Sequence, residues 1–530
     1  MSKGYIPKDL SFDSEAREKL IKGITKISKA VKSTLGPRGQ TVLIESPDHL
    51  GGITITKDGV TVAKSIFLDD PVENLSIQMM KDAASRTANV AGDGTTTAIV
   101  LTEALIKNGD DLLCDTDSKT EVIRQIQSLT KDIVSKLEKQ SKKIKENDLH
   151  DVATISANND AEVGAIISEA YKKVGVNGIV TVEKSMTAET YAEVTNGIKI
   201  DRGYTSNLFI NDQRKDECIL EDVKVLVCDT EISNLLQIES VLKPIINNQQ
   251  KLLIIGNCSP NVVNTLAANV VRNGLKFCNI IPPNFGYKQH ELMQDIAISL
   301  GAKYFSEKTG DDLSLINEND LGFANKIIIG KASSVIIRHE QMTEEIEQRI
   351  EELKEQQSNT SHPEEKKFIN ERIASLCGAI GCIYVGGNSD VEQKEKFDRV
   401  DDSVCAVKSA LEEGIVLGGG LALYNIAKEL LKTKYKDKNK NLARVILSQS
   451  LVAPYERIIW NAGIDPDTIK LSSKSNYGYD VKNEKHGDMF KMGIIDPLKV
   501  TKNALINAVS VATTILSTNA IVTHARIRQD

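Results

Sequence analysis

The chain has 530 residues, more than one hydrophobic core normally supports, so about two to four domains are expected. Apolar residues make up 41% of the chain and aromatic residues only 4%, so aliphatic side chains must fill most of the core. The formal net charge of −7 argues against nucleic acid or an anionic membrane as the main partner. No apolar run reaches the roughly 18 residues that predict a membrane span.

The cysteines and the N-terminus indicate a reducing compartment. The eight cysteines are scattered, with no CxxC pair and no Cys/His spacing typical of zinc sites, which predicts reduced and mostly buried thiols. The sequence begins Met-Ser-Lys-Gly without the pattern of a secretory or transit signal. A cytoplasmic location is therefore expected.

The first predicted element is an amphipathic helix near the N-terminus. Apolar residues recur at helical spacing over 20–31, and the glycine-containing loop 34–39 follows. A second such loop, 56–61, is predicted to link two β-rich runs at 53–55 and 60–63. Neither loop is a Walker motif, because the string GxxxxGK[ST] does not occur, so a P-loop fold is not supported.

The segment 91–97, Ala-Gly-Asp-Gly-Thr-Thr-Thr, is the most informative in the chain. Gly92 and Gly94 allow positive φ and close approach of a charged ligand, and the amides that open the next helix attract an anion. Asp93 could then hold Mg²⁺ beside phosphates. The alternative is an Asp-Gly turn that only caps a threonine-rich helix. The neighbouring glycine-containing loops favour a phosphate site assembled from several loops.

The middle of the chain predicts a connecting segment and an α/β unit. A Lys/Glu-rich helix is expected from 137 to about 147, and helix and strand alternate over 152–194. Residues 197–378 carry short apolar strands alternating with helices, a pattern typical of a parallel α/β unit. Within them, 342–376 predicts a helical hairpin whose many Glu and Lys side chains form a solvated face.

Motifs typical of nucleotide binding occur in two blocks, 34–97 and 414–496. This separation predicts one domain built from both chain ends, with other domains inserted between them. In the second block, Gly418-Gly419-Gly420 opens a predicted helix. Asp401 and Asp402 lie ahead of that block in another helix. From the residues alone, the preferred interpretation of this pair is an acidic helix N-terminus stabilised by the macrodipole.

Eight segments together identify a family: TLGPRG, TITKDGVTVA, AGDGTTTAIVL, ATISAN, DRGYTSNLF, EEGIVLGGG, NYGYD and IIDPLKV. In this order they resemble the group I chaperonins of the GroEL type, the heat-shock 60 kDa class. The resemblance extends from about residue 5 to residue 523. The resemblance allows a divergent phage-encoded member, and it implies a bacterial cytoplasm, or the host cytoplasm if the protein is phage-encoded.

The resemblance implies a multidomain fold with a mainly α-helical equatorial domain, a small α/β intermediate domain and an α/β apical domain. The implied ranges are 1–139 and 414–530 for the equatorial domain, 140–196 and 379–413 for the intermediate domain, and 197–378 for the substrate-binding apical domain. Gly197, Gly378 and Gly414 lie at the junctions, where the family places its hinges.

The resemblance also implies a site for ATP, Mg²⁺ and K⁺. The implied nucleotide contacts are Thr34, Leu35, Gly36, Pro37, Lys57, Asp93, Gly94, Thr95, Thr96, Thr97, Gly419, Asp480 and Asp496. Asp93 matches the magnesium ligand, and the carbonyls of Thr34 and Lys57 match groups near the potassium ion. Asp58 and Asp402 match the two catalytic carboxylates: Asp58 lies beside the γ-phosphate, and Asp402 positions the attacking water.

Two matches concern the nucleoside. Asp496 matches the aspartate that accepts the ribose hydroxyls, close to Gly419. Asp480 stands where the family usually has asparagine against the adenine. Because a carboxylate cannot donate to adenine N1 as an amide can, we expect a modestly weaker nucleotide affinity, with main-chain groups taking over the contact.

The implied partners are non-native polypeptides, held by exposed apolar side chains in the apical domain. The matching positions are Tyr204, Leu208, Phe209, Ile238, Leu242 and Val263. Ordinary burial in a core is the alternative, and helical spacing does not separate the two. Glu239 falls where the family has an apolar residue, which predicts weaker capture there.

The expected function is an ATP-dependent chaperonin that promotes folding inside a ring cavity, driven by ATP binding and hydrolysis. The alternative is a ring-forming protein-binding scaffold with an inefficient ATPase. A homo-oligomeric ring of about seven subunits is implied. Glu456 and Asp465 are both acidic where the family pairs opposite charges between rings, so stacking is predicted to be weak. Single or double rings, and the need for a co-chaperonin lid, stay open.

Overall fold

The computed structural model describes residues 7–45, 53–113, 118–175, 179–213, 216–338, 343–360, 362–376, 378–472 and 474–525. The chain divides into two compact units. Unit 1 comprises Met1–Lys172, Thr181–Ala192 and Ile383–Asp530, and unit 2 comprises Lys173–Val180 and Glu193–Cys382. Unit 1 is therefore built from both ends of the chain, and most of unit 2 is inserted between them.

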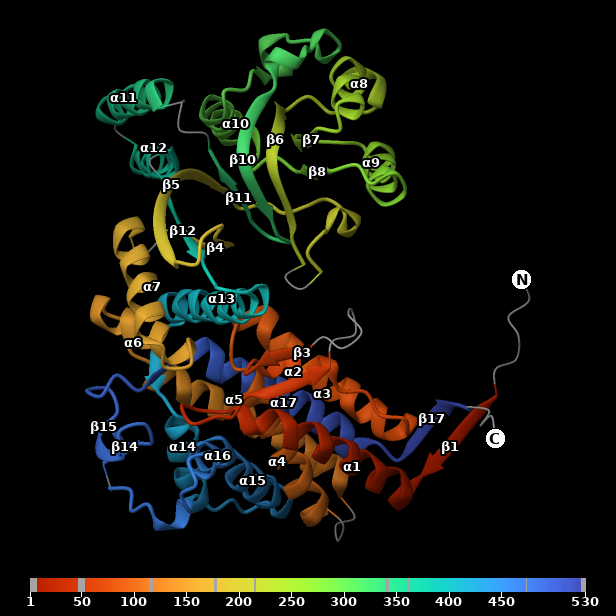
Figure 1. Cartoon of the computed structure of the whole chain (residues 1–530), viewed down its shortest axis with the longest axis vertical. Coiled ribbons are helices and arrows are strands. Elements are labelled where there is room, and N and C mark those ends of the chain that lie inside the picture. Colours follow the sequence, from red (N-terminus) through yellow and green to blue (C-terminus); the bar gives the residue numbers. More distant parts are fainter. Residues whose placement is uncertain are drawn as a thin grey trace. The chain divides into compact units, whose positions relative to one another are not determined.

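Unit 1 is mainly helical (Figure 1). Its elements are β1 Lys8–Phe12, α1 Asp13–Val31, β2 Val42–Glu45, β3 Ile53–Thr56, α2 Gly59–Ser65, α3 Pro71–Ala91, α4 Thr95–Leu113, α5 Lys119–Gln140, α6 Glu146–Ser156, α7 Ala161–Val174, α13 Asp390–Glu413, β13 Ile415–Leu417, α14 Leu421–Lys432, α15 Lys438–Leu451, α16 Ala453–Asn461, β14 Tyr477–Asp480, β15 Lys485–Asp488, β16 Ile495–Pro497, α17 Leu498–Ser517 and β17 Ala520–His524. The chain passes from one unit to the other within α7, within β4 Ile179–Lys184, near the start of β5 Tyr191–Ile200 and within β12 Ala379–Val385.

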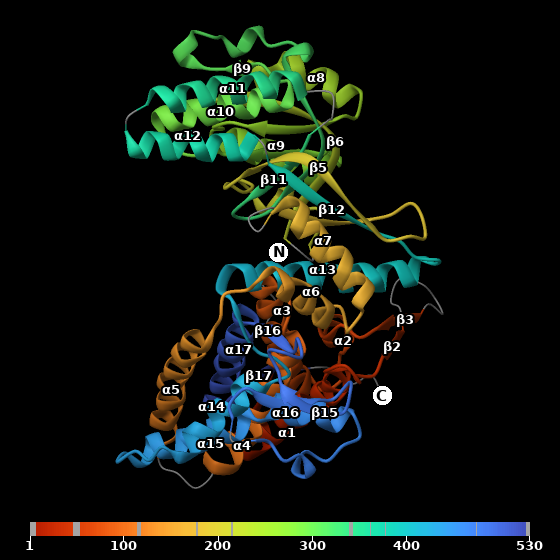
Figure 2. The same cartoon turned by 90° about the vertical axis from the view of Figure 1, so that its left-hand side faces the viewer.

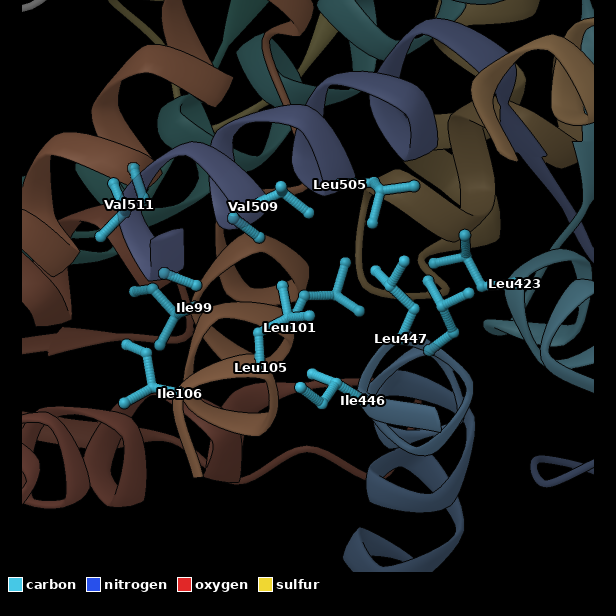
Figure 3. Close-up of a cluster of buried hydrophobic side chains, with 14 of the residues drawn as sticks. Ile99, Leu101, Leu105, Ile106, Leu423, Ile446, Leu447, Leu505, Val509 and Val511 are labelled. Atoms are coloured by element: carbon cyan, nitrogen blue, oxygen red, sulfur yellow. The ribbon is translucent and has the colours of Figure 1, made fainter. Parts of the chain in front are cut away.

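The core of unit 1 joins segments from opposite ends of the sequence. Helix α17 packs against α3, α4 and α5, and α15 packs against α4 and α5. Figure 3 shows their aliphatic side chains interlocking: Ile99, Leu101, Leu105 and Ile106 of α4, Leu423 of α14, Ile446 and Leu447 of α15, and Leu505, Val509 and Val511 of α17. Aliphatic residues thus fill this core, as the low aromatic content predicts.

The predicted β-rich run at 60–63 is wrong, because these residues lie in helix α2. Asp58 is the N-cap of α2, and its carboxylate accepts hydrogen bonds from the amides of Val60 at 3.0 Å and Thr61 at 2.7 Å. Such capping satisfies amides that have no partner within the helix. It outweighs the strand preference of the β-branched residues that follow.

The predicted helix over 137–147 is also wrong, because α5 ends at Gln140 and α6 begins at Glu146. Between them, Lys142 exchanges two backbone hydrogen bonds with Ile415, at 2.9 and 2.8 Å. This antiparallel bridge keeps the chain extended and fixes the segment beside β13. Long-range pairing therefore overrides the local Lys/Glu-rich helical pattern.

Unit 2 contains a mixed sheet in which β5, β11, β10, β6, β7 and β8 are neighbours in this order. Strands β6, β7 and β8 are parallel, as predicted, whereas β10 pairs antiparallel with both β6 and β11. The elements are β5 Tyr191–Ile200, β6 Cys218–Cys228, α8 Glu239–Asn247, β7 Lys251–Ile255, α9 Pro260–Asn273, β8 Phe277–Ile280, α10 Gly286–Leu300, β9 Tyr304–Phe305, β10 Gly322–Ile329, β11 Ser334–Ile337, α11 Thr343–Asn359 and α12 Pro363–Leu376.

The predicted helical hairpin exists as α11 and α12, which lie beside α10 (Figure 2). Its apolar seam includes Ile346, Leu353, Ile369 and Leu376. The hairpin also buries two arginines that the solvated-face interpretation did not foresee. Arg349 and Arg372 both bond the Asp295 carboxylate of α10, at 3.0 and 2.6 Å.

Two further features of the described residues are the length of their apolar helices and the state of their cysteines. Among the described residues, no helix is both long and apolar enough to cross a bilayer. The cysteines of the described part are present as thiols. Cys218, Cys228, Cys278 and Cys382 are buried, and Cys258 and Cys405 are partly buried. Cys114 and Cys377 lie outside the described residues.

Candidate functional site

The Asp93 loop connects α3 to α4. Gly92 and Gly94 both have positive φ, 76° and 84°. A Cβ atom at Gly92 would lie 2.1 Å from Cys405 Cβ, and one at Gly94 would lie 2.6 Å from Val500 Cγ1. Only glycine therefore fits at either position, and the loop is held between α13 and α17. This packing leaves Asp93 at the N-terminal end of α4, where backbone amides attract anions.

The Asp93 carboxylate accepts two hydrogen bonds, one from the Gly94 amide to Oδ1 at 2.5 Å and one from Ser156 Oγ to Oδ2 at 2.7 Å. Burial raises the pKa of the Asp93 carboxyl above its ordinary value, and the negative charge of Asp58 adds to the effect. The two hydrogen bonds act in the opposite direction. The carboxylate is thus held in one orientation inside unit 1.

Asp58 lies close to the start of α4. Gly59 approaches this helix so closely that a Cβ atom there would lie 2.2 Å from Thr96 Oγ1. The backbone amide of Asp58 donates a hydrogen bond to Thr56 Oγ1 at 3.0 Å, and this bond also fixes the position of Asp58. The structure therefore brings together two of the sequence-predicted loops, 56–61 and 91–97.

Asp402 comes from the far part of the chain and joins the same cluster. Burial, and then the negative charges of Asp58 and Asp93, raise the pKa of Asp402 well above its ordinary value. Its helix, α13, begins at Asp390, so the interpretation of Asp401 and Asp402 as a helix N-terminus is wrong. Three acidic groups from three segments therefore face one region of unit 1.

Two buried serines fix α13 in this place. Ser403 Oγ donates to the carbonyl of Ala153 in α6 at 2.7 Å, and Ser409 Oγ donates to the carbonyl of Ala91 at 2.9 Å. The second bond joins α13 to the end of α3, just before the Asp93 loop. The position of Asp402 relative to Asp93 is thus set by backbone contacts on both sides.

The Thr34–Pro37 loop is held by a distant part of unit 1. Thr34 ends a short 3₁₀ helix that packs against α4, and Gly36 has a φ of 86°. Asn461 Nδ2 donates to the carbonyls of Lys32 at 2.9 Å and Leu35 at 2.8 Å. Gly39 passes so near the Thr34 carbonyl that a Cβ atom would lie 2.0 Å from its oxygen.

Asp496 lies opposite Val416 in the β13–β16 pair, and the amides of Gly419 and Gly420 hydrogen-bond to its carboxylate. Burial, followed by the charge of Asp93, raises the pKa of Asp496 to about 7, and the two amides oppose this shift. Gly419 and Gly420 have positive φ, 61° and 76°, and lead into α14 as predicted.

Asp480 is buried, and its carboxylate accepts hydrogen bonds from residues of the same loop. Oδ1 accepts the amides of Lys482 at 2.8 Å and Asn483 at 3.2 Å, and Oδ2 accepts Asn483 Nδ2 at 2.7 Å. Much of its accepting capacity is therefore used locally. The Asp480 carboxylate therefore stabilises the 480–483 turn, a structural role that the sequence did not indicate.

The donor set fits a cation that is bound jointly with phosphates. Magnesium is usually held by one or two carboxylates together with phosphate oxygens and water, and Asp93 and Asp58 supply such carboxylates. Within the described ranges, no three His, Cys, Asp or Glu side chains are placed to hold a metal ion by themselves.

The predicted client residues of unit 2 differ in exposure. Leu208 is 53% exposed, and Tyr204 and Val263 are partly buried. Phe209, Ile238 and Leu242 are buried, at 1%, 0% and 7% exposed, so the expectation of an exposed surface at these three positions is wrong for this structure. Their side chains pack into the core of unit 2 because the sheet and its helices need apolar filling there.

Ser156 is the residue of this site that the sequence reasoning missed. It is the last residue of α6 and lies 63 positions from its partner Asp93. The only signal was its place in the ATISAN segment, to which no role was given. No local spacing rule predicts a contact between a helix end and a distant loop.

Comparison with known proteins decides the family. The model of the TCP-1/cpn60 chaperonin family matches residues 27–526. The chain belongs to this chaperonin family. The resemblance inferred from the eight segments is thereby confirmed.

Two solved structures of the chaperonin gp146 from the bacteriophage EL 2 (Pseudomonas aeruginosa), in the presence of ATP-BeFx, are similar to this chain. Crystal form II has a TM-score of 0.67 at 23% identity, and crystal form I has a TM-score of 0.62 at 24% identity. Each match covers 98% of this chain and 99% of the phage chain. At these identities the likeness shows the fold, and the predicted multidomain chaperonin fold is confirmed.

Proposed function

We propose that this protein is an ATP-dependent chaperonin that captures non-native polypeptides and promotes their folding inside a ring, driven by ATP binding and hydrolysis. The observation that carries the proposal is the convergence of Asp58, Asp93 and Asp402 at the N-terminal end of α4. Each comes from a different segment, and only the fold brings them together. The phage chaperonin with the similar fold was crystallised with an ATP analogue, which supports a nucleotide ligand.

The proposed chemistry assigns one role to each group. The amides at the start of α4 and the Thr34–Pro37 loop hold the phosphates, and Asp93 and Asp58 face the cation. Magnesium, when bound, offsets charge on the phosphates. Asp402 orients the attacking water and accepts its proton, a role suited to a carboxyl whose pKa burial and like charges have raised. The carbonyls of Thr34 and Lys57 are proposed to face K⁺.

Ring assembly is proposed from two exposed ribbons of unit 1. Strands β1 and β17 form one two-stranded ribbon, and β2 and β3 form another. Both present large apolar side chains to solvent: Leu10, Phe12 and Val522 on the first, and Leu43, Ile53 and Ile55 on the second. Isolated two-stranded ribbons are marginal in water, so neighbouring subunits are proposed to cover them in a ring of about seven.

The second candidate is a protein-binding ring with an inefficient ATPase. It is favoured by the use of Asp480 within its own loop and by the burial of Phe209, Ile238 and Leu242. The two candidates differ in turnover. In the deciding experiment, ATP hydrolysis by the purified protein is measured together with rescue of a chemically denatured, aggregating client. ATP-dependent rescue with steady turnover is expected, and client binding without turnover would favour the scaffold.

A further inference from the structure

We infer that Ser156 is a positioning residue that orients Asp93 for the magnesium ion of the bound nucleotide, so that metal affinity depends on the end of α6. This inference rests on the function proposed above. It concerns the hydroxyl of one residue, which acts through its hydrogen bond to Asp93.

The hydrogen bond from Ser156 leaves lone pairs of the Asp93 carboxylate available to a cation. Ser156 Oγ donates to Oδ2 of Asp93 at 2.7 Å, and the Gly94 amide donates to Oδ1 at 2.5 Å. Each carboxylate oxygen has two lone pairs, so Asp93 can bind a metal ion and keep both hydrogen bonds. Hydrogen bonds to a ligating carboxylate fix its orientation, and their loss typically weakens metal affinity about 10- to 100-fold.

Neighbouring segments fix Ser156 itself. Helix α6 packs along α13, where Ser403 Oγ bonds the Ala153 carbonyl at 2.7 Å. On another side, Gly493 admits the Asp151 side chain so closely that a Cβ atom would lie 2.6 Å from its carboxyl carbon. The hydroxyl is therefore presented to Asp93 by a packed helix end.

The residues after Ser156 reach the nucleoside side of the site. Asn158 and Asn159 have positive φ, 57° and 65°, and turn the chain sharply after α6. The Asn159 carbonyl accepts Lys482 Nζ at 3.4 Å, and the Lys482 amide bonds Asp480. One short segment thus touches the Asp93 loop, through Ser156, and the Asp480 loop, through Asn159.

The test measures metal-dependent binding apart from turnover. Equilibrium affinity for a fluorescent ADP analogue is measured across a Mg²⁺ titration. For Ser156→Ala, we expect the Mg²⁺ midpoint to rise about 10- to 100-fold while affinity without Mg²⁺ stays unchanged. Ser156→Thr keeps a hydroxyl and should restore the midpoint to near the wild-type value.

Two matched variants separate this role from simple anchoring. Ser409→Ala removes a hydroxyl bond to the Ala91 carbonyl near the same loop, and Ser403→Ala removes the bond that holds α6 to α13. Neither hydroxyl touches the Asp93 carboxylate, so both variants should shift the Mg²⁺ midpoint much less than Ser156→Ala does. An unshifted midpoint in Ser156→Ala, or an equal shift in Ser403→Ala, would overturn the inference.

Failure of the proposed function would look different. Wild-type protein whose ADP binding ignores Mg²⁺ altogether would overturn both the nucleotide site and the role of Ser156. Wild-type binding that depends on Mg²⁺, with Ser156→Ala unchanged, overturns the role of Ser156 alone. Thermal unfolding checks that each variant is folded. If Ser156→Ala does not fold, Ser156→Cys, with a side chain of similar size and a weak donor, takes its place in the same titration.

Discussion

Arg372 and Asp295 form a buried ion pair in unit 2, with Nε and Oδ2 2.6 Å apart. Arg372 of α12 is 1% exposed. Its Nη1 also lies 2.7 Å from Oε2 of Glu291, which belongs to α10 as Asp295 does. Arg349 of α11 bonds Asp295 as well. Both helices of the hairpin, α11 and α12, are therefore attached to α10 through one carboxylate, and the cluster is shielded from water.

Removing one partner of this cluster should destabilise unit 2 strongly. Arg372→Ala takes one of two arginines away from the buried Asp295 carboxylate and leaves Arg349 on it. Breaking a buried ion pair by removing one partner typically costs about 3–5 kcal/mol of unfolding free energy. The matched control is Lys243→Ala, which breaks the exposed Lys243–Glu239 pair of 2.8 Å and should cost about 0–1 kcal/mol. Urea unfolding, followed by a probe in unit 2, compares the two. Equal losses would contradict a buried, interdependent cluster.

Asp402→Ala should separate hydrolysis from binding. Because Asp402 is assigned to the attacking water, its loss should lower ATP turnover at least about tenfold with nearly unchanged nucleotide affinity. Asp401→Ala, which removes the adjacent charge on α13, should keep most of the turnover. Asp93→Ala should instead abolish Mg²⁺-dependent nucleotide binding. Near-normal turnover in Asp402→Ala would remove the assignment, and unchanged affinity in Asp93→Ala would mean that its loop is only a helix cap.

Nucleotide affinity should rise with pH around neutrality. The pKa of Asp496 is raised to about 7, so the carboxyl is largely protonated below that pH and ionised above it. The ionised form accepts hydrogen bonds from ribose hydroxyls better. For the protein without nucleotide the sign is opposite, because a raised pKa contributes stability at low pH that is lost as pH rises through about 7.

The control for this pH dependence is Asp496→Asn, since the nucleotide's own phosphates also titrate. ADP affinity is measured between pH 6 and 8 for both proteins, over the range that brackets the Asp496 pKa of about 7. The wild-type increase should exceed that of the variant. Parallel curves would show that the titration belongs to the nucleotide and not to Asp496.

Leu208 and Phe209 are neighbours with opposite exposure, so they test the client surface. Leu208→Ser should reduce capture of a denatured protein while the fold and the basal ATPase persist, because the Leu208 side chain is exposed. Phe209→Ser should destabilise unit 2, by about 3–5 kcal/mol, as expected for deleting a buried aromatic ring. A capture assay with a denatured protein measures the effect of Leu208→Ser, and unfolding curves measure the effect of Phe209→Ser. Undiminished capture by Leu208→Ser would exclude this segment from the client surface.

Ring stacking should be weak and should strengthen with salt. Asp465 is exposed, and the pKa of the partly buried Glu456 is raised by burial and by the nearby Asp467. If these acidic groups meet across two rings, each ring of about seven subunits repeats the repulsion. Salt screens exposed charges, so native mass measurements should show more double rings at high ionic strength. A double ring that persists at low salt and in every nucleotide state would contradict the prediction.

The sequence could predict the site's carboxylates better than the contacts that position them. Asp58 and Asp93 stand in recognisable segments, whereas Asp402 was matched only through the family resemblance. The structure brings all three together. The helix at 59–65 was missed because its cap outweighs the strand preference of its residues. Ser156 and the two hairpin arginines were missed for another reason: their partners are distant in sequence, and no periodicity encodes such pairs.

The exposure of individual side chains in unit 2 could not be predicted from the sequence either. Leu208 and Phe209 are adjacent and both apolar, and only the fold places one outside and one inside. A short 3₁₀ helix, Asn207–Phe209, turns the two side chains apart. Local composition cannot make this distinction, because exposure is decided by the sheet and helices against which the segment packs.

The two-ended construction of unit 1 also has a consequence on the ribosome. Helices α3, α4 and α5 are made early, but α17, which packs against all three, is among the last elements translated. Translation proceeds at about 5–20 residues per second, so the apolar faces of these helices remain without α17 for on the order of tens of seconds. Unit 2, whose long segment lies between these helices and α17, can be completed first. A protein proposed to protect unfinished chains would thus itself pass through a long unfinished stage.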